Sequence, residues 1–183
     1  GKSLCYFVPG LCLNGTVIVI TPLIALIQDQ IITLQNKGIS AGELHSGVTK
    51  KEREKVMELA QTGKLKFLYV TPERLSQETF RFFLAQLEIA LIVVDEAHCV
   101  SLWGHDFRPS YLKIGEIRQN IKSPVMALTA TATPSIISEI KESLLMKEPA
   151  IVKGITHRTN ISIYCEYTDK KYERLLYYLR EIE

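Results

Sequence analysis

The segment ALIVVDEAH, residues 90–98, decides the fold, because an uninterrupted apolar run ends on two carboxylates. Such a run is typical of a strand that is buried on both faces of a sheet. Asp95 and Glu96 follow it directly. Removing a carboxylate from water is unfavourable unless a cation or hydrogen bonds compensate for it. The segment therefore predicts a buried strand whose carboxyl end carries a ligand site, as in doubly wound sheets.

Similar apolar runs lie on both sides of this strand and alternate with amphipathic segments. Parallel strands need crossover connections, which are usually helices, so this alternation favours an α/β fold with a mostly parallel sheet. Thr133 and Pro134 are a typical N-cap and first helical residue, and Gly38 is a typical helix terminator. The further strands are predicted at 16–21, 66–71 and 125–130, and the helices at 24–37, 50–60, 111–121 and 134–145.

The alternation stops near residue 150. An irregular stretch is followed by a predicted strand at 161–167 and by a predicted helix at 170–183, which has one apolar stripe. That stripe needs another surface to cover it. We therefore expect a first domain over 1–153, and a linker with the beginning of a second, truncated domain over 154–183.

Composition limits the class of protein. The chain has 183 residues, of which 46% are hydrophobic and 23% charged, with a net charge of +2. Its longest apolar runs are interrupted well before a membrane span, and no signal peptide is visible. The near-neutral charge does not by itself indicate nucleic acid. The cysteines, Cys5, Cys12, Cys99 and Cys165, form no CxxC pair, so zinc is not expected, and reduced thiols favour an intracellular location.

The first residues, Gly1, Lys2 and Ser3, match the end of the phosphate-loop pattern GxxxxGK[ST]. In that pattern the lysine contacts phosphates and the hydroxyl contacts Mg²⁺. Asp95 would be the second oxygen ligand of the ion, and Glu96 could orient a water molecule. Alternatively, Asp95 is a helix cap and Glu96 a solvated side chain. Taken together, the two fragments predict binding of a nucleotide such as ATP with Mg²⁺.

The segment LTATAT, residues 128–133, ends another predicted strand with three hydroxyl groups. Threonine is a good strand former, so the segment is explained by local structure alone. Alternatively, Thr129 and Thr131 relay a change of hydrogen bonding from the nucleotide to a distant surface.

Several motifs together resemble one known family. GKS (1–3), TPLIALIQDQ (21–30), TPERL (71–75), DEAH (95–98) with CVSLWGHDFRPSY (99–111), and ALTATAT (127–133) occur in order. This set resembles the first motor domain of RecQ-type DNA helicases, within superfamily 2. The resemblance implies a RecA-like sheet with helices on both faces, plus the start of a second lobe, and roles in DNA repair and recombination.

The resemblance also implies roles for individual residues. Lys2 and Ser3 would contact phosphate and Mg²⁺, Asp95 would hold Mg²⁺ through water, and Glu96 would polarise the attacking water. The family's coupling residues, between nucleotide and DNA, match His98, Thr129 and Thr131.

The aromatic-rich loop is the most specific part of the resemblance. The family uses this loop to sense single-stranded DNA, and in this chain it carries Trp103, His105, Phe107 and Arg108. Bases stack on aromatic faces without regard to sequence. The alternative is that Trp103 and Phe107 are core aromatics. Thr71 and Arg74 match positions along the family's DNA path.

The sequence also departs from the family pattern. Leu102 and Ser110 replace a usual glutamine and a usual acidic residue. The upstream glycines of the phosphate loop, the base-reading segment and the arginine finger of the second lobe are not in the sequence.

The resemblance therefore implies an ATP-driven lobe of a 3′-to-5′ DNA helicase that acts on single-stranded and duplex DNA and needs a second lobe for catalysis. It would lie in the cytoplasm of a bacterium or the nucleus of a eukaryote. The alternatives are a motor acting on RNA and a non-catalytic docking remnant.

Overall fold

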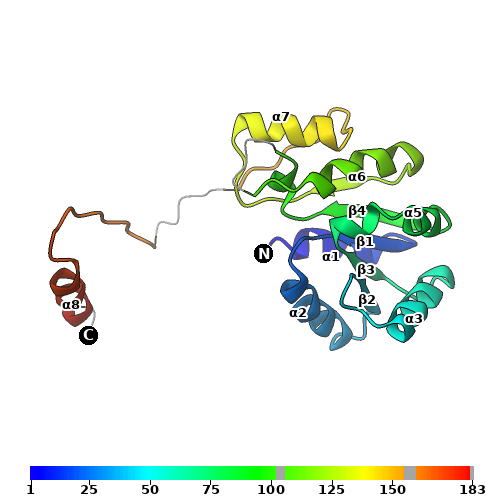
Figure 1. Cartoon of the computed structure of the whole chain (residues 1–183), viewed down its shortest axis with the longest axis horizontal. Helices are drawn as coiled ribbons and strands as arrows, with labels where there is room; N and C mark the ends of the chain where they lie inside the picture. Colours follow the sequence, from blue (N-terminus) through cyan, green and yellow to red (C-terminus); the bar gives the residue numbers. More distant parts are fainter. Residues whose placement is uncertain (102–105, 155–159, 182–183) are drawn as a thin grey trace. The chain divides into compact units, whose positions relative to one another are not determined.

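The computed structural model describes residues 1–101, 106–154 and 160–181. The chain divides into two compact units, Gly1–Pro149 and Ala150–Glu183. The first unit contains the sheet and its helices, and the described part of the second contains one helix (Figure 1).

The first unit is built on a five-stranded sheet of order β2-β3-β1-β4-β5, in which every neighbouring pair is parallel. This confirms the predicted α/β class. Four strands lie where they were predicted, and β2 was missed because its sequence AGEL is short and lacks β-branched residues. The strands are β1 (Thr16–Ile20), β2 (Ala41–Leu44), β3 (Phe67–Val70), β4 (Ile89–Val94) and β5 (Val125–Ala127).

Helices form the crossover connections between the parallel strands. The Thr49 side chain and Glu52 form a reciprocal capping box, and Thr133 caps the helix that begins at Pro134, as predicted. Helices α4 and α5 and the short 3₁₀ helix η1 were not expected from the sequence. The helices are α1 (Leu4–Cys12), α2 (Ile24–Gln35), α3 (Lys50–Gln61), α4 (Pro72–Leu75), α5 (Glu78–Ala85), η1 (Ala97–Val100), α6 (Pro109–Asn120) and α7 (Pro134–Ser143).

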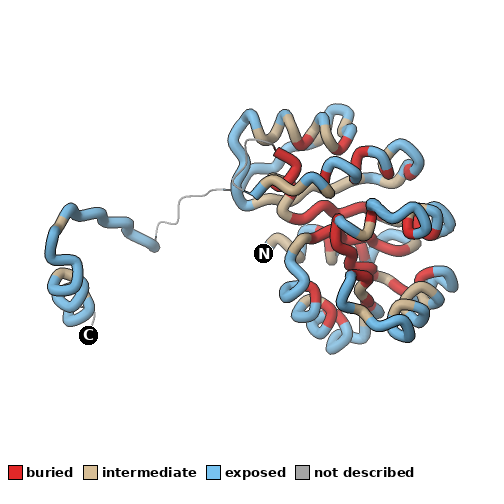
Figure 2. The backbone as a smooth tube through the Cα atoms, viewed as in Figure 1, coloured by how far each residue is buried: buried red, intermediate tan, exposed pale blue. Residues whose placement is uncertain are grey.

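The core consists of two apolar clusters, one on each face of the sheet. Alternate residues of the same strand belong to different clusters, so Ile18 and Ile20 pack with α3, α5, α6 and α7, whereas Val17 and Val19 pack with α1 and α2. Helices therefore cover both faces, as predicted. Figure 2 shows the buried residues concentrated in the central strands.

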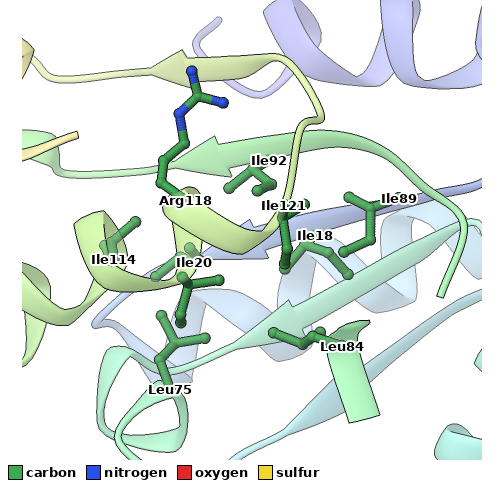
Figure 3. A pocket seen from close by; sticks show the side chains of 10 residues that line it. Ile18, Ile20, Leu75, Leu84, Ile89, Ile92, Ile114, Arg118 and Ile121 are labelled. Atoms are coloured by element: carbon green, nitrogen blue, oxygen red, sulfur yellow. The ribbon is translucent and has the colours of Figure 1, made fainter. Parts of the chain in front are cut away.

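A small void of about 10 Å³ remains between the sheet and α6. Apolar side chains line it, among them Ile20, Ile92 and Ile114 (Figure 3). The Arg118 guanidinium donates to the carbonyl oxygens of Ser123 and Leu144. A cavity of this size barely accommodates one water molecule and offers it few polar partners. The void is therefore a packing defect of the core, not a ligand site.

The second unit contains α8 (Lys171–Glu181), which matches the predicted helix. The predicted strand at 161–167 is wrong, since these residues form no strand in the structure. A strand needs a neighbour for its backbone hydrogen bonds, and the described part of this unit offers none. The apolar stripe of α8 is exposed, with Tyr172 at 74% and Leu175 at 54%.

Candidate active site

The candidate site lies at the carboxyl edge of the sheet, where β4 ends beside β1. The backbone N–H of Asp95 donates to the carbonyl of Ile20 at 2.9 Å, which extends the strand pairing to the carboxylate itself. Lys2 lies just before α1. Tyr6 of α1 belongs to the apolar cluster that also contains residues of β1 and β4. The parallel topology thus brings together residues that are 94 positions apart in the sequence.

Lys2 is paired with both carboxylates. Its Nζ atom lies 2.5 Å from Glu96 Oε1 and 3.7 Å from Asp95 Oδ1. Partial burial lowers the pKa of Lys2, but the hydrogen bond to Glu96 and the charges of both carboxylates outweigh it and leave the pKa above its ordinary value. The ammonium is therefore the cation that compensates the carboxylates at the strand end.

Asp95 is only 8% exposed. Its Oδ1 accepts the backbone N–H of Glu96 at 3.0 Å, and its backbone carbonyl accepts the Tyr111 hydroxyl at 2.9 Å. Burial raises the pKa of the Asp95 carboxyl above its ordinary value, and the charge of Lys2 opposes this shift without cancelling it. The carboxylate is thus under-compensated, which is what a binding site for a further cation requires.

Oxygen donors at this edge fit a hard cation such as Mg²⁺. No hydrogen bond to a described residue occupies Asp95 Oδ2, and Ser3 makes no capping hydrogen bond at the start of α1. Gly1, which precedes Lys2 and Ser3 in the phosphate-loop fragment, is exposed. Asp95 and Ser3, the two predicted magnesium ligands, therefore each keep a side-chain oxygen that can bind a cation.

Glu96 has an unusual backbone conformation. Its φ of 47° and ψ of 45° lie in the left-handed region, which is costly for a residue with a side chain. The conformation turns the chain from β4 into η1, where the Ala97 N–H bonds the carbonyl of Leu128. Strain of this kind persists only where surrounding contacts impose it, so the geometry marks Glu96 as a candidate functional residue.

The predicted coupling residues lie together. The His98 Nδ1 atom is 2.9 Å from the Thr129 hydroxyl and 3.4 Å from Glu96 Oε2. The Thr129 hydroxyl in turn contacts the backbone N–H and carbonyl of Thr131 at 3.2 and 3.1 Å. A continuous set of polar contacts therefore runs from Lys2 through Glu96 and His98 to the end of β5.

Part of the aromatic-rich loop is described. Trp103 and His105, and also Leu102, lie outside the described residues. Phe107 and Arg108 are partly buried, and the Arg108 backbone N–H bonds the carbonyl of Cys99 at 3.0 Å. The Arg108 side chain is paired with Asp106 at 3.4 Å. The part of the loop that carries Arg108 is thus hydrogen-bonded to η1, which begins immediately after Glu96.

The two candidates after β3 lie apart from these contacts. Thr71 is 6% exposed, which leaves little of it for a ligand. Arg74 donates to Gln77 at 2.6 Å, and its guanidinium lies 5.6 Å from the Phe80 ring centre. Burial, and then the charge of Arg53, lower the pKa of Arg74. No described carboxylate forms a salt bridge with Arg74, so its charge remains available to an anion.

One other group of potential ligands occurs among the described residues, His98, Cys99 and Asp106, whose ligand atoms lie within 4.8 Å of one another. Burial, and then the charge of Asp106, raise the pKa of the Cys99 thiol to about 11. Metal ligation requires the thiolate, which this environment disfavours. The group is therefore better explained as packing around η1.

Two buried tyrosines near the site, Tyr111 and Tyr6, were not expected from the sequence to have a role there. Tyr111 is fully buried and supports the backbone at Asp95. Tyr6 is 1% exposed and donates to Gln30 of α2. A tyrosine within an apolar run gives no sign of its hydroxyl partner, so neither role could be found in the sequence.

No helix in the described ranges is long and apolar enough to cross a membrane. The profile of the DEAD/DEAH box helicase family matches residues 1–140. The chain is 41% identical, over 88% of its length, to the ATP-dependent DNA helicase RecQ of Pasteurella multocida. It is 43% identical, again over 88% of its length, to the ATP-dependent DNA helicase Q5 of Mus musculus. It spans only 26% and 17% of these relatives, respectively.

The fold is also shared with solved structures. The helicase domain of Pyrococcus furiosus Hef has a TM-score of 0.58 to this chain at 20% identity, and the match covers 80% of this chain and 31% of that one. At this identity the likeness concerns the fold alone. The match of the family profile to residues 1–140 carries the assignment further: the chain belongs to the DEAD/DEAH box helicase family, and it is similar in sequence to RecQ-type DNA helicases.

Proposed function

We propose that this chain is the ATP-binding motor domain of a DNA helicase, which couples ATP hydrolysis to movement along single-stranded DNA and to duplex unwinding. The observation that carries the proposal is the set of contacts from Lys2 through Glu96 and His98 to Thr129. It joins a candidate phosphate contact to a candidate water-polarising carboxylate. From there it continues to the hydroxyls after β5. The sequence similarity to RecQ-type helicases supports DNA as the polymer.

Each residue has a role that follows from its chemistry. Lys2 would bind the phosphates, with Gly1 and the other backbone N–H groups at the start of α1 beside it. Asp95 and Ser3 would hold Mg²⁺, which supplies charge neutralisation to the phosphates. Glu96 would orient and polarise the attacking water.

The pairing of Lys2 with Glu96 has a consequence for this mechanism. A phosphate competes with Glu96 for the ammonium of Lys2, so that binding of the nucleotide frees the carboxylate. His98 then lies within reach of the freed carboxylate, at 3.4 Å from its Oε2 atom. Binding of phosphate therefore increases the fraction of Glu96 that is free for catalysis.

The exposed stripe of α8 supports a requirement for a second motor domain. Apolar side chains at Leu175, Leu176 and Leu179 are 54%, 38% and 53% exposed. A helix of this kind gains most of its stability by packing that face against another element. Catalysis would require that second domain to supply a cation at the transition state, which is worth roughly 10³–10⁵ in rate in related phosphoryl transfers.

The polymer could also be RNA, or the chain could be a docking module without turnover. The aromatic-rich loop favours DNA, because that loop is the RecQ-like feature of the sequence. The intact set of Lys2, Asp95 and Glu96 favours turnover. The direct test measures binding of Mg·ATP to the chain, and then ATP hydrolysis by a protein that joins it to a second motor domain, with single-stranded DNA or RNA added.

We expect Mg·ATP to bind the chain, and DNA to stimulate hydrolysis by the two-domain protein more than RNA does. Glu96→Gln should abolish that stimulation, and Glu58→Gln, an exposed substitution on α3, should serve as its control. Equal stimulation by RNA would assign the motor to RNA, and absence of turnover in the parent would leave the docking function.

A further inference from the structure

A buried cluster of polar side chains lies beneath the candidate site, on the face of the sheet covered by α1 and α2. Tyr6 of α1 and Tyr69 of β3 are 1% and 0% exposed. The Tyr6 hydroxyl donates to Gln30 Oε1, at 2.5 Å, which joins α1 to α2 across 24 positions of sequence. Tyr69 carries a buried hydroxyl without a hydrogen-bond partner among the described residues. Polar groups are costly at this depth, so the cluster is not explained by burial alone.

The cluster adjoins the residues that would bind the nucleotide. Burial raises the pKa of Tyr6, while the nearby hydroxyls of Tyr69 and Ser3 lower it and the charge of Asp95 raises it again. Burial also raises the pKa of Tyr69 far above its ordinary value, and Tyr6 and Asp95 add to the shift. The charge of Asp95 thus acts on both phenols, and the backbone of Tyr6 is hydrogen-bonded to Ser3.

The position of Tyr6 determines which part of the site its hydrogen bond to Gln30 can stabilise. Tyr6 is in the first turn of α1, and its backbone N–H bonds the carbonyl of Ser3 at 3.2 Å. Ser3 and Lys2 directly precede this turn, and Ser3 has no capping hydrogen bond of its own. The start of α1 thus lacks the usual side-chain cap. The bond from Tyr6 to Gln30 ties this turn to the partly buried middle of α2.

We propose that Tyr6 and Gln30 are positioning residues for ATP, which fix the start of α1 against α2 and so hold Lys2 and Ser3 where the phosphates and Mg²⁺ bind. The inference rests on the proposed function of the site. Neither residue contacts the reacting atoms, and the hydrogen bond acts through α1. Loosening it would let Lys2 move relative to Asp95 and Glu96, and displacements near 1 Å are costly in sites of this kind.

The test compares this hydrogen bond with a matched one on the same helix. Gln35 Nε2 donates to the carbonyl of Ala41 at 3.1 Å, which ties the other end of α2 to β2, away from the site. Tyr6→Phe, Gln30→Leu and Gln35→Leu each remove one hydrogen bond of α2. Melting temperatures report the structural loss, and the Kd of Mg·ATP, measured by titration of the chain, reports positioning.

We expect similar losses of melting temperature in the three variants. Tyr6→Phe and Gln30→Leu should weaken ATP binding about 3- to 10-fold, the range that corresponds to one hydrogen bond. The double variant should be no weaker than either single variant, because both remove the same bond. Gln35→Leu should bind ATP like the parent.

The outcomes separate this inference from the proposed function. If the parent binds ATP and Tyr6→Phe binds it equally well, or if Gln35→Leu weakens it as much, the positioning role is overturned and the proposed function stands. Multiplied losses in the double variant would also overturn it. If the parent chain shows no ATP binding at all, the proposed function fails and the inference fails with it.

Discussion

Lys2 Nζ lies 2.5 Å from Glu96 Oε1, so the candidate phosphate contact is also the partner of the candidate catalytic carboxylate. The side chains are 40% and 20% exposed, and such a partly exposed pair is worth at most about 1 kcal/mol. A ligand that carries several negative charges can therefore displace Glu96 from Lys2 at little cost. The ion pair therefore occupies Lys2 in the absence of a ligand, but it does not prevent phosphate from binding there.

Glu96→Gln should bind ATP somewhat more tightly than the parent, because the substitution removes a competitor for Lys2. The expected gain is up to about fivefold, which corresponds to the worth of the ion pair. In a protein with both motor domains, hydrolysis should fall by roughly 10²-fold or more, since an amide cannot act as a base. Titration of the chain with Mg·ATP and a steady-state assay measure the two effects.

Lys2→Ala provides the contrast. It should weaken ATP binding and hydrolysis together, because it removes the phosphate contact itself. Parent-like hydrolysis by Glu96→Gln, or unchanged ATP affinity in Lys2→Ala, would contradict the assignment of the two roles.

Asp95→Asn should stabilise the fold at neutral pH while it impairs function. Burial raises the pKa of Asp95, so the folded protein binds this proton more tightly than the unfolded chain does. A raised carboxyl pKa means that the fold loses stability as the pH rises from the unfolded pKa through the folded one. Unfolding free energies of Asp95→Asn and the parent should agree below about pH 3.8 and diverge above it in favour of the variant. A variant that is less stable at pH 7 would refute this account.

Tyr111→Phe should loosen the end of β4. The hydroxyl donates to the Asp95 carbonyl at 2.9 Å, and its loss leaves a buried acceptor without this partner. We expect about 1 kcal/mol less stability in urea unfolding, and weaker binding of Mg·ATP. Tyr167→Phe, at a 94% exposed site, is the control and should change neither quantity. Equal effects in both variants would exclude a role for the buried bond.

Thr129→Val should separate ATP binding from its coupling to DNA. The substitution keeps the shape of the side chain but removes the hydroxyl that contacts His98 and the backbone of Thr131. In the two-domain protein, ATP affinity should stay within about twofold of the parent, and stimulation of hydrolysis by single-stranded DNA should fall roughly 10-fold or more. The partly exposed Thr168 offers a matched control as Thr168→Val, because its hydroxyl accepts the Lys170 N–H, far from the site in sequence.

Arg108→Ala tests the loop. The side chain is 33% exposed and pairs with Asp106, so its loss should cost at most about 1 kcal/mol of stability. Stimulation of hydrolysis by single-stranded DNA should collapse, because the substitution removes the guanidinium that would contact DNA phosphate or stack on a base. The backbone N–H of residue 108 still bonds Cys99 of η1 in the variant, so the loop stays attached next to Glu96. Arg81→Ala removes a similar pair, at 38% exposure and 3.3 Å from Glu116, and should leave stimulation intact.

Trp103→Ala extends this test on the basis of the sequence. We expect it to act like Arg108→Ala on stimulation. The alternative outcome is that Trp103→Ala lowers the free energy of unfolding by about 3–5 kcal/mol while Arg108→Ala keeps full stimulation. In that case Trp103 is a core aromatic, and the DNA-sensing role of the loop should be abandoned.

Local sequence was sufficient where one segment carries its own pattern. The run before Asp95 predicted β4, and the Thr133-Pro134 pair predicted the start of α7. It was insufficient for β2, whose sequence AGEL becomes a strand only by pairing with β3. It also misled at 161–167, where a strand-like sequence has no neighbour to pair with in the described unit.

The sequence by itself determined the fold class and the chemical inventory of the site. Apolar continuity and alternation are local properties, and the order of the motifs carried the likeness to helicases. Only the tertiary structure decided which groups meet. The approach of Lys2 to Glu96, the strained backbone of Glu96 and the bond from Tyr6 to Gln30 depend on strand order and helix packing. These are set by the burial of the whole sheet, which no single segment encodes.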